Sequence, residues 1–307
     1  MNVAVFTLGC KLNQCESEAL ADAFHQQGFT IVPHYSQADI YIVNTCTVTS
    51  KAEQKARRMI RKFAAGEHAP SVIITGCYAE MEPDELRRLP GTIHIVPLSR
   101  KQYLLRLPTA IKTSIEGGYT LREAIEEWLR SDGMEDDPDW DYQSKFDYKA
   151  VTFQYHARAF LKIEDGCDNR CSYCRVSIAR GKAVSLHQDE VIRRALELEE
   201  RGFREIVLTG VNITAYRDGE TDLADIITLL GRMLTGTRIR LSSLEPDMIS
   251  GKLAEACGSP LVQPHFHLPV QSGSDLLLRR ANRHYTAADV LDAVSLLRSV
   301  KEDPFIA

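Results

Sequence analysis

Three features are scarce in this sequence, and each scarcity excludes a class of protein. No apolar run approaches the roughly 20 residues that a membrane-spanning helix requires. The N-terminus, MNVAVFTLGC, has neither a basic leader nor a long apolar region, which argues against a secretory signal. Positive charge is also scarce: 37 Lys and Arg against 42 Asp and Glu give a net charge of −5, which argues against a uniformly basic nucleic-acid binder. We therefore expect a cytoplasmic protein.

Cysteine, by contrast, is well represented, with eight residues in the chain. Thiols stay reduced in the cytoplasm, so these cysteines are better interpreted as metal ligands or core residues than as disulfides. The length of 307 residues is enough for about two domains, and an apolar content of 44% is enough to build their cores.

Strand and helix patterns alternate through the first hundred residues. Apolar runs at 3–9, 38–46, 71–77 and 92–97 predict strands, and helical patterns follow at about 16–27, 50–64 and 83–89. Near-continuous apolar strands separated by helices are typical of a parallel sheet that is covered on both faces. We therefore expect an α/β domain with an open parallel sheet over residues 1–111.

The alternation of strand and helix patterns is interrupted at residues 112–150 and returns after them. Residues 112–150 contain one amphipathic helix and an acidic segment with Gly and Pro, which predicts a linker with little core of its own. Strand patterns return at 158–166, 205–210, 238–246 and 265–273, with helices at 187–202 and after Thr286, which Asp289 is placed to cap. The final FIA predicts the start of a fifth strand. Residues 151–307 are thus expected to form a partial βα barrel that stops before its last strands.

Three cysteines of the second region lie within eight positions, in CDNRCSYC: Cys167, Cys171 and Cys174. They follow a predicted strand, at the edge where βα barrels assemble active sites. A structural zinc site usually has four ligands in pairs, and no CxxC partner exists elsewhere. Isolated core thiols would not be surrounded by residues such as Asp168 and Arg170. A 4Fe–4S cluster normally takes one thiolate per iron, so three thiolates leave one iron open to a small molecule.

CxxxCxxC is the pattern of the radical S-adenosylmethionine (SAM) enzymes, and this segment resembles that superfamily. The resemblance implies that SAM binds the open iron and that an electron from the cluster cleaves its sulfonium. The resulting 5′-deoxyadenosyl radical would then abstract a hydrogen atom from the substrate. Tyr173 would lie near the adenine, although simple packing beside the cluster is an equally good interpretation.

Polar residues and glycines follow the other strands of this region. Parallel strands share one carboxyl edge, so these positions are candidates to bind SAM, although polar residues after strands are often only turns. The candidates are Gly210 and Asn212, then Ser243 and Glu245, then Gln271, Ser272 and Gly273.

Cys10, Cys46 and Cys77 are scattered along the sequence, yet they share one local setting. Each ends a predicted parallel strand that a helix follows, in FTLGC, IVNTC and IITGC. Such strand ends meet at one edge of an open α/β sheet, where ligands bind. The alternative is three independent buried thiols. The shared setting favours a second iron–sulfur cluster, again with one open iron. Cys15 and Cys257 lack this setting, and we expect them to be incidental.

Together, the two cysteine sets resemble the methylthiotransferases, radical SAM enzymes with an N-terminal auxiliary-cluster domain. The similarity covers almost the whole chain, through TLGCKLNQCESEAL, NTCTVTSKAEQKARR, CDNRCSYCRVSIARG and HFHLPVQSGSDLLLRRANRHYT. It implies that Cys10, Cys46 and Cys77 hold an auxiliary 4Fe–4S cluster and that Cys167, Cys171 and Cys174 hold the SAM cluster. It also implies that one SAM methylates a sulfur on the auxiliary cluster and that a second SAM provides the radical.

The motifs most closely resemble the branch that acts on C2 of N6-threonylcarbamoyladenosine at tRNA position 37. The branches for isopentenyladenosine in tRNA and for an aspartate of a ribosomal protein remain alternatives, and a non-enzymatic zinc or electron-transfer protein is a more distant one. Two departures stand out: Cys15 replaces a usual Tyr, and CRVSIARG lacks a usual Pro and Tyr.

The resemblance implies two partners, tRNA and a one-electron donor such as a flavodoxin or ferredoxin. Basic residues that could contact phosphates lie on the helix at 51–62 and after the fourth barrel strand, although a solvated helix face would look the same. They are Lys51, Lys55, Arg57, Arg58, Arg61 and Lys62, and then Arg279, Arg280 and Arg283. The family also has a C-terminal RNA-binding β-barrel domain that these 307 residues lack. We therefore expect the natural protein to be longer.

Overall fold

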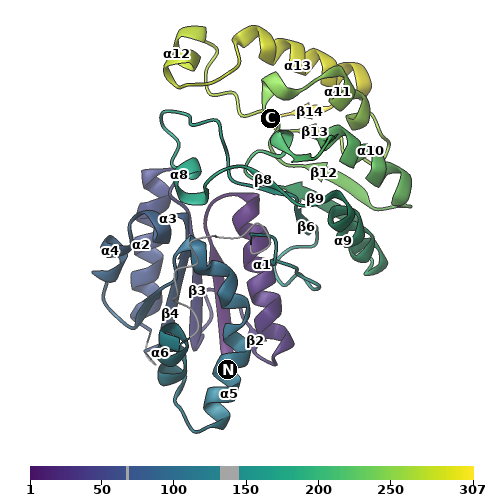
Figure 1. Ribbon diagram of the computed structural model, residues 1–307. Helices are drawn as coiled ribbons and strands as arrows, with labels where there is room; N and C mark the ends of the chain where they lie inside the picture. Colours follow the sequence, from purple (N-terminus) through teal and green to yellow (C-terminus); the bar gives the residue numbers. More distant parts are fainter. Residues whose placement is uncertain (67–68, 132–144) are drawn as a thin grey trace. The chain divides into compact units, whose positions relative to one another are not determined.

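The computed structural model describes residues 1–66, 69–131 and 145–307, which form two compact units, Met1–Tyr155 and His156–Ala307 (Figure 1). Within these ranges, no helix is long and apolar enough to cross a membrane. Each unit is described separately below.

The first unit is built on a five-stranded sheet in which every strand is parallel to its neighbours, in the order β2-β1-β3-β4-β5. The strands are β1 (Asn2–Thr7), β2 (Thr30–Ile31), β3 (Ile40–Thr45), β4 (Ser71–Gly76) and β5 (Ile93–Ile95). The predicted parallel sheet is confirmed. The sequence pattern missed only β2, which at two residues is too short to show a periodicity.

Both faces of this sheet are covered, which explains its near-continuous apolar strands. Along β3, Tyr41 and Val43 join one apolar cluster, whereas Ile40 and Ile42 join another on the opposite face. The first face is covered by α2 (Ser50–Ala64), α3 (Cys77–Met81) and α4 (Pro83–Arg87). The second is covered by α1 (Lys11–Gln26), the 3-10 helix η1 (Leu98–Leu105), α5 (Leu107–Glu116) and α6 (Leu121–Ser131).

The boundary of this unit differs from the expected one at residue 111. The helix α6 contributes Ile125 and Trp128 to the core, so the first half of the expected linker belongs to the first unit. Residues 151–155 belong to it too, because Val151 N donates to Asp22 Oδ2 at 2.8 Å and Gln154 N donates to a carboxylate on α1. Residues 145–150 of the expected linker also belong to the first unit, and 132–144 lie outside the described residues.

The second unit is a row of parallel strands with helices between them. β6 (Ala159–Lys162), β9 (Glu205–Thr209) and β12 (Arg238–Leu241) form a sheet in the order β12-β9-β6. β13 (His265–Phe266) pairs with β14 (Phe305–Ile306), and parallel bridges from Ile239 to Val262 and from Ser243 to His267 connect this pair with β12. The four predicted strands and the start of a fifth are therefore confirmed.

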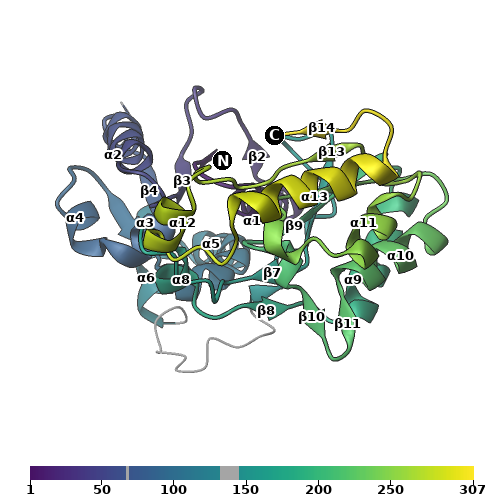
Figure 2. The same cartoon turned by 90° about the horizontal axis from the view of Figure 1, so that it is seen from above.

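Four helices follow one another beside these strands, each in contact with the next (Figure 2). They are α9 (Gln188–Glu200), α10 (Leu223–Met233), α11 (Gly251–Cys257) and α13 (Ala287–Val300). The predicted cap of α13 is confirmed, because Thr286 N donates to Asp289 Oδ2 at 2.7 Å and Thr286 Oγ1 accepts from Asp289 N. The shorter elements are β7 (Glu164–Asp165), α8 (Val176–Arg180), β8 (Val184–Ser185), η2 (Ile213–Ala215), β10 (Arg217–Asp218), β11 (Thr221–Asp222), η3 (Pro246–Met248) and α12 (Asp275–Arg280).

Candidate functional site

The cysteine loop of the second unit, residues 167–174, begins at a glycine that the fold requires. Gly166 has φ +85°, and a Cβ atom there would lie only 2.0 Å from the backbone oxygen of Lys182. The next amide, Cys167 N, donates to Gly181 O at 3.1 Å. A residue without a side chain therefore lets the loop lie directly against residues 181–182.

A buried group of charges fixes the start of this loop. Asp165 accepts from Lys162 Nζ at 2.6 Å and from Arg180 Nη1 at 3.0 Å. All three side chains are almost fully buried, so each charge depends on the others for compensation. Lys162 and Arg180 could not be predicted as site residues from the sequence, because a single charged residue in a strand or short helix belongs to no recognisable motif.

The far side of the cysteine loop is held by the end of α12. Ser172 N donates to Ala281 O at 3.1 Å, and Asn282 Nδ2 donates to the backbone oxygens of Asn169 and Arg170 at 3.2 and 3.1 Å. Arg170 and Asn282 both have positive φ, +48° and +54°, which is uncommon outside glycine. Two segments more than 100 residues apart in sequence therefore determine the shape of this loop.

The cysteine sulfurs accept hydrogen bonds from the surrounding chain. Arg283 Nη1 donates to Cys171 Sγ at 3.2 Å, and Val176 N donates to Cys174 Sγ at 3.4 Å. Burial raises the pKa of the Cys167 thiol to about 11, so its thiolate would need a positive partner. A cavity of about 480 Å³ opens at the loop, lined by all three cysteines.

These donors fit an iron–sulfur cluster better than a single ion. Among the described residues, no three thiol, imidazole or carboxylate groups are arranged to hold one metal ion. A cubane cluster offers each thiolate its own iron, so its ligands do not have to converge on one point. Positive iron would also stabilise the thiolate forms of these cysteines.

Gly210 and Asn212, predicted at the end of β9, pack against Glu164. A Cβ atom on Gly210 would lie 2.5 Å from Glu164 Oε2, and the same oxygen accepts from Asn212 N at 2.7 Å. Burial raises the pKa of Glu164 well above its usual value, and its Oε1 has no hydrogen-bond partner. The sequence analysis had not singled out Glu164.

Ser243 and Glu245 follow β12 along the same edge. Ser243 Oγ lies 2.8 Å from His267 Nδ1, and Glu245 forms an ion pair with Arg283. Burial raises the pKa of Glu245 even though Arg283 lowers it. Through Arg283, the structure therefore connects Glu245 with Cys171.

The remaining predicted SAM contacts lie on more open parts of the chain. Tyr173 is 51% exposed within the cysteine loop. Gln271, Ser272 and Gly273 occupy the loop before α12, where Gln271 N donates to the hydroxyl of Tyr285 at 3.2 Å. The structure thus places Gly210, Asn212 and Glu245 against buried polar groups. Tyr173, Gln271, Ser272 and Gly273 remain more accessible.

In the first unit, Cys46 and Cys77 directly follow β3 and β4, and Cys10 follows β1 after Leu8 and Gly9; these three strands are neighbours in the sheet. A Cβ atom on Gly9 would lie 2.8 Å from Cys46 Cβ, so the chain just before Cys10 lies against Cys46. A Cβ atom on Gly76 would lie 2.4 Å from Thr45 O, which ties the β4 end to the β3 end. Both glycines have positive φ. The predicted convergence of these strand ends is therefore present.

Polar side chains hold the three strand ends in register. Asn13 Nδ2 donates to Leu8 O at 2.8 Å and to Thr45 O at 3.0 Å, which bridges the ends of β1 and β3. Thr45 Oγ1 donates to Thr75 O at 2.5 Å and so bridges β3 and β4. The three cysteines therefore follow strand ends that hydrogen bonds hold together.

A buried lysine is connected to this hydrogen-bond network through Asn44. Lys101 Nζ forms an ion pair with Glu16 and donates to Asn44 Oδ1 at 2.9 Å, and Asn44 Nδ2 donates to Asn13 O at 2.9 Å. Lys101 and Glu16 are almost fully buried. Lys101 lies on η1, so sequence spacing gave no hint that it would reach this edge.

All eight cysteines lie in the described ranges, and none of them forms a disulfide. Cys10 is exposed, whereas Cys46 and Cys77 are each 4% exposed. Cys15 is buried on α1, and Cys257 is buried at the end of α11, where burial raises its pKa to about 12.

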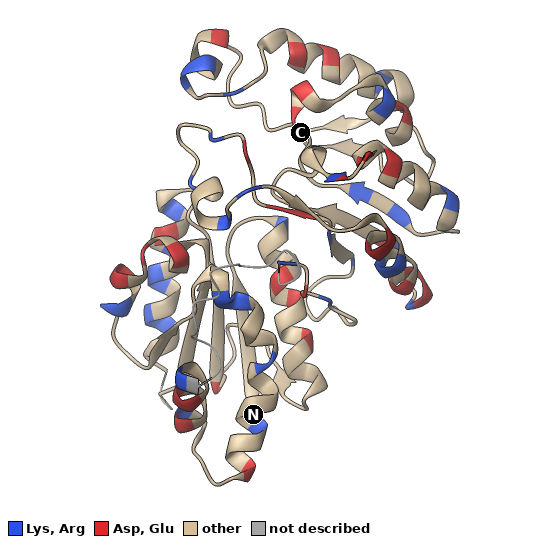
Figure 3. Cartoon of the chain, in the orientation of Figure 1, with Lys and Arg blue, Asp and Glu red and all other residues tan. Residues whose placement is uncertain are grey.

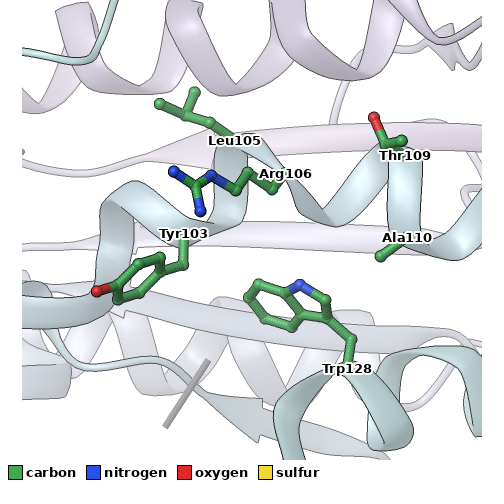
Figure 4. Close-up of a pocket in the computed structure, with 6 residues that line it drawn as sticks. All are labelled: Tyr103, Leu105, Arg106, Thr109, Ala110 and Trp128. Carbon is green, nitrogen blue, oxygen red and sulfur yellow. The ribbon is translucent and has the colours of Figure 1, made fainter. Parts of the chain in front are cut away.

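A second cavity of about 480 Å³ occurs in the first unit. Figure 4 shows its lining, with the Arg106 guanidinium, the Tyr103 ring and the Trp128 indole around it. Its lining residues lie on η1, α5 and α6 or, for Arg106, between η1 and α5, and they include no cysteine and no predicted site residue.

Comparison with known families agrees with this division of the chain. The model described as the uncharacterized protein family UPF0004 matches residues 2–97, and the model of the Radical SAM superfamily matches residues 161–303. The second unit is therefore a radical SAM domain, and the chain uses SAM and a 4Fe–4S cluster.

Relatives specify the family further. The chain is 37% identical to the threonylcarbamoyladenosine tRNA methylthiotransferase MtaB of Treponema pallidum, over 99% of this chain and 73% of the relative. It is 31% identical to the MtaB of Thermotoga maritima, over 98% of this chain and 65% of the relative. It is 34% identical to a tRNA-2-methylthio-N(6)-dimethylallyladenosine synthase of Acidithiobacillus ferrooxidans, over 98% and 65%. The chain belongs to the radical SAM methylthiotransferase family and spans about two thirds of the length of these relatives.

Solved structures share the fold. A cobalamin-dependent radical SAM enzyme, OxsB, superposes with a TM-score of 0.59 at 12% identity, over 97% of this chain and 48% of OxsB. The radical SAM methyltransferase TsrM of Kitasatospora setae superposes with a TM-score of 0.56 at 13% identity, over 97% and 67%. The predicted α/β architecture and radical SAM core are confirmed.

Proposed function

We propose that this chain methylthiolates C2 of N6-threonylcarbamoyladenosine at position 37 of tRNA, with two SAM molecules and two 4Fe–4S clusters. One observation carries the proposal: the ends of β1, β3 and β4 are tied together, and each is followed by a cysteine. In the methylthiotransferases that this chain resembles, a second three-cysteine site holds the cluster that carries the transferred sulfur. The names of the relatives from T. pallidum and T. maritima support the substrate.

In this proposal each cysteine set has its own role. Cys167, Cys171 and Cys174 hold the SAM cluster, and Cys10, Cys46 and Cys77 hold the auxiliary cluster. When bound, the first cluster would supply the electron that cleaves SAM to the radical, and the second would hold the sulfur that is transferred. A flavodoxin or ferredoxin would provide the electrons.

The predicted SAM contacts divide into two groups that support different roles. Gly210 and Asn212 approach Glu164, whose Oε1 has no hydrogen-bond partner, so this carboxyl oxygen would be available to a polar group of SAM. Glu245 and Ser243 shape the same edge. Tyr173, Gln271, Ser272 and Gly273 are more accessible and suit contacts with the outer part of SAM.

The helix α2 is the best candidate for tRNA contact in the first unit. Lys51, Lys55, Arg58, Arg61 and Lys62 are all exposed on it, and Figure 3 shows their positive charge along the helix. Arg57 differs from them, because it bonds to the Tyr78 hydroxyl and to Glu85 at 3.0 Å.

An exposed aromatic ring lies close to this basic face. Tyr35 is 77% exposed, and its ring centroid is 5.7 Å from that of His34. Burial lowers the pKa of His34, and the nearby Lys62 and Lys55 lower it further, which places His34 beside the basic face. Exposed aromatic and basic side chains together are typical of surfaces that stack bases and contact phosphates.

Salt-dependent binding tests this surface. Lys55→Gln, Arg58→Gln and Lys62→Gln should each reduce tRNA affinity and reduce the slope of log K against log salt by about 0.7–0.9. The control is Lys112→Gln, an exposed lysine on α5. If all four variants bind with the same slope as the parent, tRNA does not contact α2.

Mass spectrometry of tRNA nucleosides tests the reaction. A strain that lacks the gene should lose the 2-methylthio form of N6-threonylcarbamoyladenosine, and the parent gene should restore it, whereas a gene carrying Cys46→Ala should not. Loss of the 2-methylthio form of isopentenyladenosine would instead assign the chain to the branch of the A. ferrooxidans relative. An unchanged nucleoside profile would refute both and would leave ribosomal-protein methylthiolation as the reaction to test.

A further inference from the structure

Arg283 occupies an unexpected position for a basic residue. Its place in the sequence predicts a phosphate contact, as for Arg279 and Arg280, and those two are exposed. The Arg283 side chain is instead only 6% exposed. A guanidinium is rarely buried without a purpose, because its desolvation must be compensated by specific partners.

The partners of Arg283 lie on three different segments. Nη1 donates to Cys171 Sγ at 3.2 Å, Nη2 pairs with Glu245, and the guanidinium carbon lies 4.8 Å from the centre of the Tyr285 ring. Glu245 is itself only 11% exposed. The guanidinium is therefore fixed between a cysteine sulfur and a buried carboxylate.

The end of α12 determines how Arg283 reaches this place. Asn282 has φ +54° and ends the helix, and Arg283 N donates to Leu278 O at 2.9 Å. The same Asn282 holds the cysteine loop through the backbone oxygens of Asn169 and Arg170. A single helix end therefore shapes the loop and places a positive charge at one of its sulfurs.

The consequence for a cluster follows from electrostatics. With three thiolates, a 4Fe–4S cluster carries a net charge of −1 when oxidised and −2 after it takes one electron from an external donor. A buried positive charge and a hydrogen bond at sulfur stabilise the more negative state. Hydrogen bonds to sulfur and local charge are known to set the reduction potentials of such clusters. A neighbouring carboxylate has the opposite effect.

We propose that Arg283 and Glu245 form a positioning pair that sets the reduction potential of the SAM cluster, with Arg283 raising it through Cys171 and Glu245 lowering it. This inference concerns the radical SAM cluster and does not depend on the proposed tRNA substrate. Arg283 is thus removed from the candidate RNA contacts and assigned to the cluster.

The test is a redox titration followed by electron paramagnetic resonance. The parent would be the full chain with Cys10, Cys46 and Cys77 changed to Ala, reconstituted anaerobically and reduced with dithionite, so that the auxiliary site cannot contribute. Arg283→Gln should lower the equilibrium constant for one-electron reduction by about tenfold, which corresponds to about 59 mV towards more negative potential. Glu245→Gln should shift the potential in the opposite direction.

Arg279→Gln is the matched control, because it removes the same charge from an exposed position on α12. It should leave the potential unchanged. Arg283→Lys keeps the charge but loses the planar fork that reaches Cys171 and Glu245 together, so it should give an intermediate shift. Iron content measured on each variant confirms that a cluster is present.

Opposite shifts for Arg283→Gln and Glu245→Gln support the proposal. Shifts in the same direction, or no shift in either variant at full iron content, overturn it. If Arg283→Gln does not retain iron, the sign of the Glu245→Gln shift decides the question alone: a positive shift supports the pair, and an unchanged or more negative potential overturns it.

Discussion

The two sets of three cysteines are positioned by different parts of the fold. In the second unit, Cys167, Cys171 and Cys174 lie on one loop of eight residues. In the first unit, Cys10, Cys46 and Cys77 come from three strands, and only the sheet brings them together. Yet Cys10, Cys77 and Cys167 each follow a glycine with positive φ. A sharp backbone turn before the thiol is thus common to a local site and a dispersed one.

Each site also rests on buried charges. The first has Lys101 with Glu16, and the second has Asp165 with Lys162 and Arg180. In the second group, Asp165 is held by both a lysine and an arginine. Both sites are therefore expected to lose stability when a buried cation is replaced by an apolar residue.

The largest expected effect separates the two sites by chemistry. Cys171→Ala should abolish the formation of 5′-deoxyadenosine, because the SAM cluster loses a ligand, whereas Cys46→Ala should retain it. Each variant should hold about four irons instead of the parent's roughly eight. Iron analysis and chromatography of the SAM products measure both quantities. Retained SAM cleavage in Cys171→Ala would contradict the assignment of that loop.

The buried charges should give the next largest effect. Lys101→Met removes a buried cation that pairs with Glu16 and should destabilise the first unit by about 3–5 kcal/mol. Arg180→Met removes a buried cation that pairs with Asp165 and should destabilise the second unit by a similar amount. Hydrogen exchange with mass spectrometry reports each unit separately. A loss below about 1 kcal/mol in either variant would show that its buried ion pair does not support the site.

The glycines before the cysteines should show a smaller effect. Gly76→Ala and Gly166→Ala each combine a positive φ with a backbone contact at 2.4 and 2.0 Å, and should cost about 2–4 kcal/mol. Gly28→Ala is the control, because Gly28 has φ +85° but no atom within 4 Å of its added Cβ, so only the conformational cost of about 1 kcal/mol remains. Urea unfolding measures the free energy of unfolding of all three variants. If Gly28→Ala loses as much stability as the other two, the backbone contacts at Gly76 and Gly166 do not contribute to the loss.

The smallest expected effect concerns pH and the second unit alone. Burial by itself raises the pKa of Glu199, but backbone amides of Gly236, Thr237 and Thr235 lower it to about 2. Because the folded pKa is below the unfolded value, this carboxylate stabilises the fold above about pH 5. The contribution is lost as pH falls from there towards 2.

Glu199→Gln should therefore cost about 1–2 kcal/mol at pH 7, and the difference from the parent should shrink towards pH 3. Urea unfolding followed by circular dichroism at a series of pH values measures it. A difference that is independent of pH would show that the ionised carboxylate is not responsible. Glu220→Gln, a change at an exposed carboxylate, is the control.

Much of the scaffold could be predicted because it has a local signal. The apolar runs of β1, β3, β4 and β9 and the cap at Thr286 and Asp289 depend on neighbouring residues only. The extent of the first unit could not be predicted from the sequence. The apolar face of α6 shows only that the helix packs on something, and the fold shows that Ile125 and Trp128 pack in the core beside the sheet. Arg283 was assigned to the surface for the same reason: its burial depends on Cys171 and Glu245, which are far away in the sequence.

The sequence by itself determined the spacing of Cys167, Cys171 and Cys174, because the covalent chain fixes how far apart residues of one short loop can lie. It also determined that three further cysteines each end a strand. Only the tertiary structure decided that the ends of β1, β3 and β4 are neighbours, through Asn13, Thr45 and Lys101. Only the tertiary structure directed Arg283 towards a sulfur. Strand order and the burial of a single charge depend on contacts across the whole fold, which no local pattern records.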